Sequence, residues 1–383
     1  MQARHLLLWL LAASIWGSAF LFMAWSVSGF SVLETLLLRQ GIGGFCLLIA
    51  SALVAATNSD FARNGGEVLL NPRLLWRLLA LGIINNVAPV FLVAQAQKRA
   101  AAGAVSAIVS SAPLFTCALE AALDPARKLP SSDVSWGLGL GAMGLSGFFG
   151  VTIGHGDLKV LWGIVYALCC AICYGFGSVL AKRMLGEFGL HPLWGSTVQV
   201  VCACVCDLAV CGVAAKLASS GSDLAFSWAQ LVSQDNALPW VGCVYQGIFS
   251  TAVGFFLYFY LVDTIGPVAL TSAWMTFPVY GYSEALIFLP HQFKDMSLLS
   301  GIVEAISSCF IVAGLYFVVV RSSGAAGQSV GKGDNNNNYG GGNPNDPRKS
   351  NRSSFSSMDG LEHDIPSPGV HYQALEAGND ADQ

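Results

Sequence analysis

Residues 101–113 read AAGAVSAIVSSAP, and residues 266–278 read GPVALTSAWMTFP. Each stretch begins with small residues and reaches a proline twelve positions later. An acid follows about two helical turns on, Glu120 in the first case and Glu284 in the second. A similar echo links Trp16-Gly-Ser to Tyr174-Gly-Phe. The sequence therefore predicts an internal duplication.

The duplicated stretches belong to a series of long apolar segments between residues 6 and 320. The chain has 383 residues, of which 54% are hydrophobic and 11% charged, whereas soluble domains carry about a quarter charged residues. A membrane span needs about 20 apolar residues. We therefore expect an all-α integral membrane protein with ten transmembrane helices. They are predicted at 6–28, 32–57, 74–97, 101–123, 134–153, 159–184, 193–215, 238–262, 267–290 and 297–320.

Ten spans divide into two repeats of five, residues 1–155 and residues 156–321. Because five is an odd number, the second copy is expected to be inverted in the membrane relative to the first. Inverted repeats place a substrate site near the midplane, where the two halves meet. Pro89, Pro113 and Pro278 lie inside predicted spans, and each is expected to interrupt its helix.

Residues 322–383 differ in composition from the rest of the chain. They hold 4 basic and 8 acidic residues, glycine-rich stretches and the run Asn335 to Asn338. Such a segment cannot bury enough apolar surface to fold, so we predict a disordered tail. Lys and Arg in the predicted loops number nine on the side of the N-terminus and five on the other. This asymmetry predicts cytosolic termini, with the plasma membrane as the default location and an endomembrane as the alternative.

Several short motifs resemble a known family. They are Trp16-Gly-Ser, Leu38-Arg39, Pro113-Leu-Phe, Tyr258-Phe-Tyr and Gly266-Pro-Val-Ala. Their order and spacing over residues 6–320 resemble the drug/metabolite transporter superfamily, specifically the EamA-like ten-helix permeases. The resemblance implies transport of a small molecule. One departure is Asp124-Pro125, which stands where members of the family often have Gly-Glu.

Charged residues inside spans are costly and normally face a cavity or a partner. Glu120 and Glu284 are the strongest pair because the repeat relates them, and either is a candidate proton or cation carrier. Arg39 either holds an anionic group or extends toward the membrane interface. Asp207 and Glu304 have no repeat partner, so we assign them structural roles.

Uncharged polar and aromatic residues complete the candidate substrate site. Amides in membranes bond across helices as often as they bind ligands, and Gln246 is weighed in the same way as the others. Aromatic residues set among glycines suit the wall of an apolar pocket. Together with the three charged residues, the candidates are Trp16, Ser18, Asn85, Asn86, Gln95, Tyr174, Gln199, Tyr258 and Trp274.

Other classes of protein fit the sequence less well. Gly144-Leu-Ser-Gly and Gly154-His-Gly-Asp spell short motifs of intramembrane proteases, but a nucleophilic serine needs a base within reach and no histidine is mid-span. Most of the 11 cysteines lie in apolar runs and are interpreted as packing residues. We expect no enzyme, cofactor, metal or nucleic-acid partner. The sequence predicts a secondary transporter of a small organic solute, coupled to protons or to exchange; a channel or membrane scaffold is the alternative.

Overall fold

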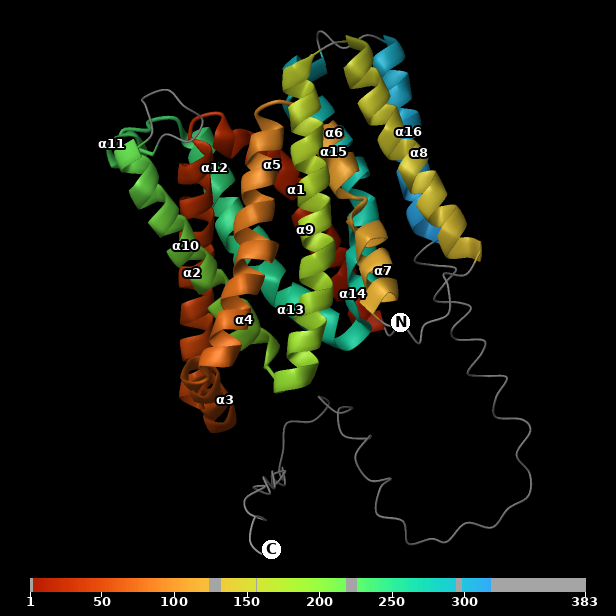
Figure 1. Cartoon of the computed structure of the whole chain (residues 1–383). Coiled ribbons are helices and arrows are strands. Elements are labelled where there is room, and N and C mark those ends of the chain that lie inside the picture. Colours follow the sequence, from red (N-terminus) through yellow and green to blue (C-terminus); the bar gives the residue numbers. More distant parts are fainter. Residues whose placement is uncertain (1–2, 124–131, 156, 218–225, 294–297, 318–383) are drawn as a thin grey trace, which may run out of the picture. The chain divides into compact units, whose positions relative to one another are not determined.

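The computed structural model describes residues 3–123, 132–155, 157–217, 226–293 and 298–317, and every regular element in these ranges is helical (Figure 1). The elements are α1 (Ala3–Val27), α2 (Val32–Thr57), α3 (Ser59–Leu70), α4 (Pro72–Gly82), η1 (Ile83–Val87), α5 (Ala88–Gln97), α6 (Ala102–Val109), α7 (Ala112–Leu123), α8 (Ser132–His155), α9 (Leu158–Phe188), α10 (Pro192–Leu217), α11 (Trp228–Val232), α12 (Ala237–Tyr245), η2 (Gln246–Val253), α13 (Gly254–Ile265), α14 (Pro267–Thr271), η3 (Ser272–Thr276), α15 (Phe277–Phe288), η4 (Pro290–Phe293) and α16 (Leu298–Tyr316).

Seven helical stretches in the described residues are long and apolar enough to cross a membrane. They are Ala3–Val27, Val32–Thr57, Pro72–Gln97, Ala102–Glu120, Leu158–Phe188, Pro192–Lys216 and Ala237–Ile265. This is the composition of an integral, multi-pass, all-α membrane protein. The count of ten spans and the inversion of the halves remain predictions, and the tail at 322–383 lies outside the described residues.

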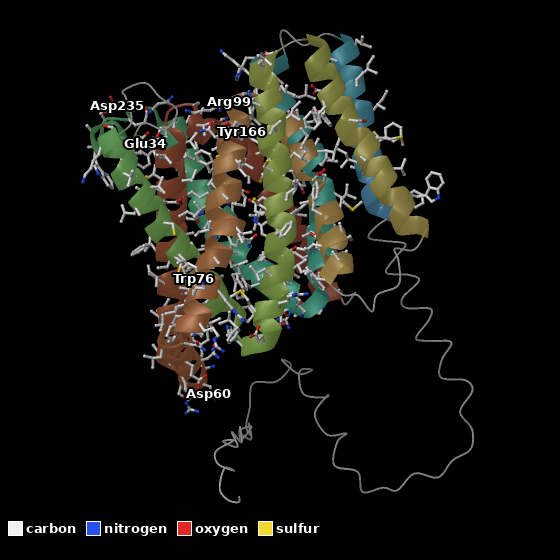
Figure 2. All side chains as sticks on the ribbon, in the orientation of Figure 1. Glu34, Asp60, Trp76, Arg99, Tyr166 and Asp235 are labelled. Atoms are coloured by element: carbon white, nitrogen blue, oxygen red, sulfur yellow. The ribbon has the colours of Figure 1, made fainter. Side chains whose placement is uncertain are left out.

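Charged side chains gather at the two ends of the helices. Figure 2 places Glu34, Arg99 and Asp235 at one end and Asp60 at the other. Glu34 helps to begin α2, because its carboxylate accepts the backbone N–H of Ser31 at 2.8 Å while the Ser31 hydroxyl accepts the N–H of Glu34 at 3.2 Å. This reciprocal cap satisfies two N–H groups that the helix leaves unpaired. Charged and capping residues thus lie at the ends of the helices, and the apolar residues between them pack against neighbouring helices.

One helix was not expected. Residues 58–73 were interpreted as a polar break, but α3 occupies most of them. The Asn58 side chain caps the helix by accepting the N–H of Phe61 at 2.9 Å. Phe61 and Val68 are buried and lie on one helical face, with the Phe61 ring stacked 5.1 Å from that of Trp194. The segment is therefore a short amphipathic helix, too polar to span and held by its apolar face.

Each of the three prolines follows an irregular segment. The π-helical turn η1 ends just before Pro89, the α6–α7 break falls at Ser110 and Ser111 before Pro113, and the 3₁₀ turn η3 precedes Pro278. Proline lacks an N–H and clashes with the carbonyl four residues earlier, which explains these positions. A second π segment, η2, interrupts the span that ends in α13 without a proline.

Candidate functional site

A narrow cavity lies among the interrupted helices. Its volume is about 50 Å³. This is enough for a few waters but far less than the several hundred Å³ of a typical ligand pocket. Its lining comes from α1, α2, η1, α5 and α6 in the first half of the chain and from α9, η2, α13, η3 and α15 in the second. The residues are Trp16, Ala19, Phe20, Met23, Arg39, Asn85, Val90, Val93, Val109, Tyr174, Gln246, Phe255, Tyr258, Trp274 and Phe277.

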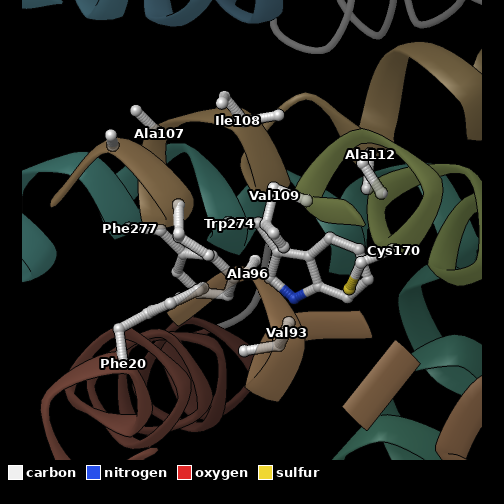
Figure 3. Packing of buried hydrophobic residues seen from close by; sticks show 14 of the residues in the cluster. Phe20, Val93, Ala96, Ala107, Ile108, Val109, Ala112, Cys170, Trp274 and Phe277 are labelled. Atoms are coloured by element: carbon white, nitrogen blue, oxygen red, sulfur yellow. The ribbon is translucent and has the colours of Figure 1, made fainter. Parts of the chain in front are cut away.

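Aromatic rings build much of the wall. Figure 3 shows Trp274 and Phe277 beside Val109 and Phe20, in the larger of the buried apolar clusters. The rings of Phe20 and Phe277 are 5.3 Å apart at their centroids and tilted by 62°. Tyr174 lies 5.0 Å from Trp274. Such edge contacts are the favoured arrangement of aromatic pairs, and they fix the shape of the apolar surface.

Arg39 is the one charged side chain among the lining residues, and it is 5% exposed. Its Nε donates to the Thr251 hydroxyl at 2.9 Å and its Nη1 to the Gln246 amide oxygen at 2.7 Å, both on η2. The Gln246 amide nitrogen in turn donates to the Ala19 carbonyl at 2.6 Å. Arg39 therefore points into the bundle rather than toward the membrane interface, and η2 holds it in place.

Glycines allow this close approach of α2 and η2. A Cβ at Gly43 would lie 2.5 Å from Thr251 Cγ2 and 2.9 Å from the Gly247 carbonyl oxygen, and one at Gly247 would lie 2.6 Å from Ile42. All three distances are shorter than real Cβ contacts, so each position requires glycine. Small residues at such interfaces let helix backbones approach in membranes, and here they bring Gln246 and Thr251 within reach of Arg39.

The π segment η2 also holds one of the aromatic residues of the cavity wall. The Ser250 carbonyl accepts the indole N–H of Trp16 at 3.2 Å. A π turn inserts one extra residue and shifts the hydrogen-bond register, and such turns are frequent at functional sites. In this protein the altered register fixes Trp16, which lies edge-on to Tyr258 and to Trp274 at 6.3 Å in each case.

Several polar groups in the cavity lining make no hydrogen bond of normal geometry. They are both amide atoms of Asn85, the hydroxyl of Tyr258 and the indole nitrogen of Trp274, all enclosed in the described structure, with the Tyr258 hydroxyl close to Asn85. These three residues are 0%, 1% and 3% exposed, and all line the cavity. Buried polar groups are normally paired, so their common position indicates a site where a ligand or water completes the bonding.

Cavity residues recur at one spacing along the chain. Val90 and Phe255, Val93 and Tyr258, and Val109 and Trp274 are separated by 165 positions each (90 to 255, 93 to 258, 109 to 274). The same shift relates the two proline-bearing stretches. Trp16 and Tyr174, which correspond in the short motif near each repeat's start, also both line the cavity. Equivalent positions of the two halves therefore face one space.

The cavity brings together half of the predicted site residues: Trp16, Arg39, Asn85, Tyr174, Tyr258 and Trp274. Three others have polar contacts elsewhere. The Ser18 and Tyr245 hydroxyls lie 2.6 Å apart, Asn86 accepts from the Gln40 amide at 3.2 Å, and the Gln95 side chain accepts from Arg99. Gln199 is fully buried on α10, and both its amide atoms lack a described partner.

The related acids lie outside the cavity lining. Glu120 is partly buried near the end of α7, and Glu284 is partly buried on α15 with one carboxylate oxygen enclosed and without a described partner. Asp207, assigned a structural role, lines a separate apolar groove between α2, α5 and α10. In the described parts of the chain no three His, Cys, Asp or Glu side chains come together as metal ligands would.

Gln246 was weighed as a polar residue but not included among the site candidates, and Thr251 was not singled out. Both contact Arg39 only because η2 changes register and Gly43 and Gly247 permit close packing. The signal in the sequence was the run Gln246-Gly-Ile-Phe-Ser-Thr, in which polar and small residues interrupt an apolar span.

Comparisons with known proteins agree with this architecture. Residues 4–150 match the model of the EamA-like transporter family. An uncharacterized transporter of Bacillus subtilis (strain 168), YdfC, is 21% identical over 307 residues, which cover 78% of this chain and 88% of that protein. A protein of known crystal structure superposes with a TM-score of 0.54 and 19% identity, covering 85% of this chain and 99% of its own; at this identity it shows the fold alone. The match over residues 4–150 agrees with the resemblance noted in the sequence.

Proposed function

We propose that the protein is a ten-helix secondary transporter that moves a small organic solute by alternating access between two inverted five-helix repeats. The observation that carries this proposal is the cavity itself. It lies where the two halves meet, repeat-equivalent residues line it, and it combines aromatic walls with a few placed polar groups. Inverted repeats build substrate sites in this position.

The size of the cavity supports a mechanism in which the halves move. An organic solute needs several times the present volume, so a state that admits it must be wider. The interruptions at Ser110 and Ser111 and at η3 lie beside the cavity residues Val109 and Trp274. Both are positions where backbone hydrogen bonding already departs from the α pattern, and such positions suit the hinges of a rocking bundle. A channel would instead need a continuous polar path.

Transport is testable in proteoliposomes offered a defined mixture of amino acids, organic acids, nucleosides and amines, with the vesicle contents analysed by mass spectrometry. Val109→Phe fills the cavity from α6, and Ala19→Leu fills it from α1. Val205→Phe serves as the control. It makes the same valine-to-phenylalanine change as Val109→Phe, but on the surface of α10, where Val205 is 60% exposed. We expect uptake to be lost in both cavity variants and kept in the control, with all three folded by thermal melting. Uptake that survives both cavity variants would contradict the proposal.

Proton coupling, where it operates, is assigned to Glu284 or Glu120. Glu284 has an enclosed carboxylate oxygen without a described partner, and a carboxyl in that setting is a suitable proton carrier. With Glu120→Gln and Glu284→Gln combined, we expect uptake to lose its dependence on an imposed pH gradient while uptake driven by solute exchange persists. An unchanged dependence on the pH gradient would remove both acids from the mechanism.

We further propose that both termini face the cytosol and that the repeats extend over residues 1–155 and 156–321. The excess of Lys and Arg on the side of the N-terminus supports the orientation. Accessibility of an introduced cysteine at Ser59 to a membrane-impermeant reagent tests it: labelling only in permeabilised cells is expected.

A further inference from the structure

The cavity offers an imbalance between hydrogen-bond donors and acceptors. A guanidinium has five N–H donors and no acceptor. Arg39 uses Nε and Nη1 on the neutral oxygens of Thr251 and Gln246. The remaining N–H groups of this 5%-exposed side chain have no hydrogen-bond partner among the described residues. A buried arginine in this state presents donors and a positive charge to the cavity that it lines.

The other unpartnered groups in the lining add to the same imbalance. The Trp274 indole nitrogen is a donor only, the Asn85 amide nitrogen is a donor, and the Tyr258 hydroxyl donates or accepts. The Asn85 amide oxygen is the one group of this set that only accepts. A ligand that satisfies this wall must therefore be rich in acceptors and poor in donors.

The charges around Arg39 further restrict the net charge of a ligand that the cavity can bind. Among the described residues no carboxylate lies within 4.0 Å of the Arg39 guanidinium. Asp207 lines the separate groove beside α10 and gives Arg39 neither a hydrogen bond nor an ion pair. One cation without a paired acid suits a single negative charge. A dianion lacks a second cation in the lining, and an amine meets a like charge.

The rest of the lining is apolar. Phe20, Met23, Val90, Val93, Phe255 and Phe277 surround the space, and such a surface accepts a hydrocarbon or aromatic body. We infer that the site takes an organic monoanion, with a carboxylate on Arg39 and an aromatic or branched apolar body against these side chains. This assignment rests on the proposed transport function and names the chemical class of its solute. A carboxylate matches the planar fork of a guanidinium.

The test uses matched solutes in proteoliposomes of the full chain: 3-phenylpropanoate, 3-phenylpropanamide, 3-phenylpropylamine and phenyl phosphate, with the corresponding 4-methylpentanoate series. We expect the carboxylate of at least one series to enter at least about tenfold faster than its amide, with the amine and the phosphate slower still. Arg39→Gln should reduce the ratio of carboxylate to amide to near one. Arg39→Lys keeps the charge without the fork, so it should keep the preference at a lower rate. Arg63→Gln, at a residue whose side chain is 74% exposed, is the control and should behave as the natural chain.

Each other outcome has a distinct meaning. Entry of the amide or the amine as fast as the carboxylate overturns the monoanion assignment and leaves transport intact. A carboxylate preference that survives Arg39→Gln overturns the role of Arg39. If no solute in the matched series enters while the wider mixture of metabolites does, the monoanion assignment fails alone. If nothing enters from either set, transport and the assignment fail together.

Discussion

The π segments η1 and η2 stand at corresponding places in the two halves, yet the cavity-lining amides that they carry, Asn85 and Gln246, are in opposite states. In η2, Gln246 and Thr251 are bonded to Arg39, and Gln246 is also bonded to Ala19. In η1, neither amide atom of Asn85 has a described partner. Of the two amides, the one on η2 is therefore bonded without a ligand, and the one on η1 is not.

A π turn can therefore carry a polar side chain that is already hydrogen-bonded or one that is not, and the two cases have different consequences. A satisfied network fixes a charge in one orientation, and a fixed orientation keeps a recognition group ready for its ligand. An unsatisfied group lowers the stability of the empty protein and gains its bonds when a ligand arrives. Substitution of Gln246 should thus act first on stability, whereas substitution of Asn85 should act first on transport.

Gln246→Met should have the largest effect on stability. Methionine matches the unbranched shape of glutamine but cannot accept from Arg39, so a buried charged donor loses its partner. Breaking a hydrogen bond to a charged group costs about 1.5–3 kcal/mol, and we expect a clear fall in melting temperature in detergent together with loss of uptake. Gln199→Met is the control, because Gln199 is equally buried and its amide has no described partner. Equal destabilisation of the two variants would show that the bond to Arg39 is not the cause.

Gly43→Ala should have the next largest effect. The added methyl would lie 2.5 Å from Thr251 and 2.9 Å from the backbone oxygen of Gly247, so α2 and η2 must separate. Overpacking of this kind costs about 1–3 kcal/mol, and the separation pulls Arg39 away from its partners. Gly41→Ala is the control two residues away, since a Cβ there meets nothing within 4 Å.

Thermal melting and uptake decide this second comparison. We expect Gly43→Ala to melt at a lower temperature and to transport poorly, and Gly41→Ala to match or slightly exceed the natural chain in stability because alanine favours a helix. If both variants melt and transport alike, close packing of α2 on η2 does not hold the arginine.

The positions of the long helices could be predicted from the sequence, because the length of an apolar segment and the charges that flank it are local features. The expected ends of α1, α2 and α10 fall within a few residues of those observed. The site candidates chosen from the sequence include Trp16, Arg39, Asn85 and Trp274, which line the cavity, because polar or aromatic residues stand out in apolar spans. The contacts that hold Arg39 could not be predicted from the sequence. No proline marks the change of hydrogen-bond register in η2, and the partners of Arg39 lie more than 200 positions away.

Dependence on residues that are distant in the sequence also explains why α3 was not expected and why Glu120 and Glu284 lie outside the cavity lining. The amphipathic face of α3 depends on Trp194, which is far along the chain, so polarity alone made the segment look like a loop. Glu120 and Glu284 were paired by sequence spacing. Which space a helical side chain faces depends on how its helix is rotated in the bundle, and a spacing between repeats does not fix that rotation.

Asn85→Leu should have the smallest effect on stability and the most informative one. The substitution replaces an unpaired amide by an apolar group of similar size, so it removes an unmet desolvation cost, and we expect the empty protein to be unchanged or more stable by up to about 1 kcal/mol. Uptake should nevertheless fall at least tenfold, because the solute loses the amide donor of Asn85. Gain of stability with loss of activity is the expected signature of a group kept for binding. A large fall in melting temperature would mean instead that Asn85 is already paired in the empty state, and the contrast between η1 and η2 would then disappear.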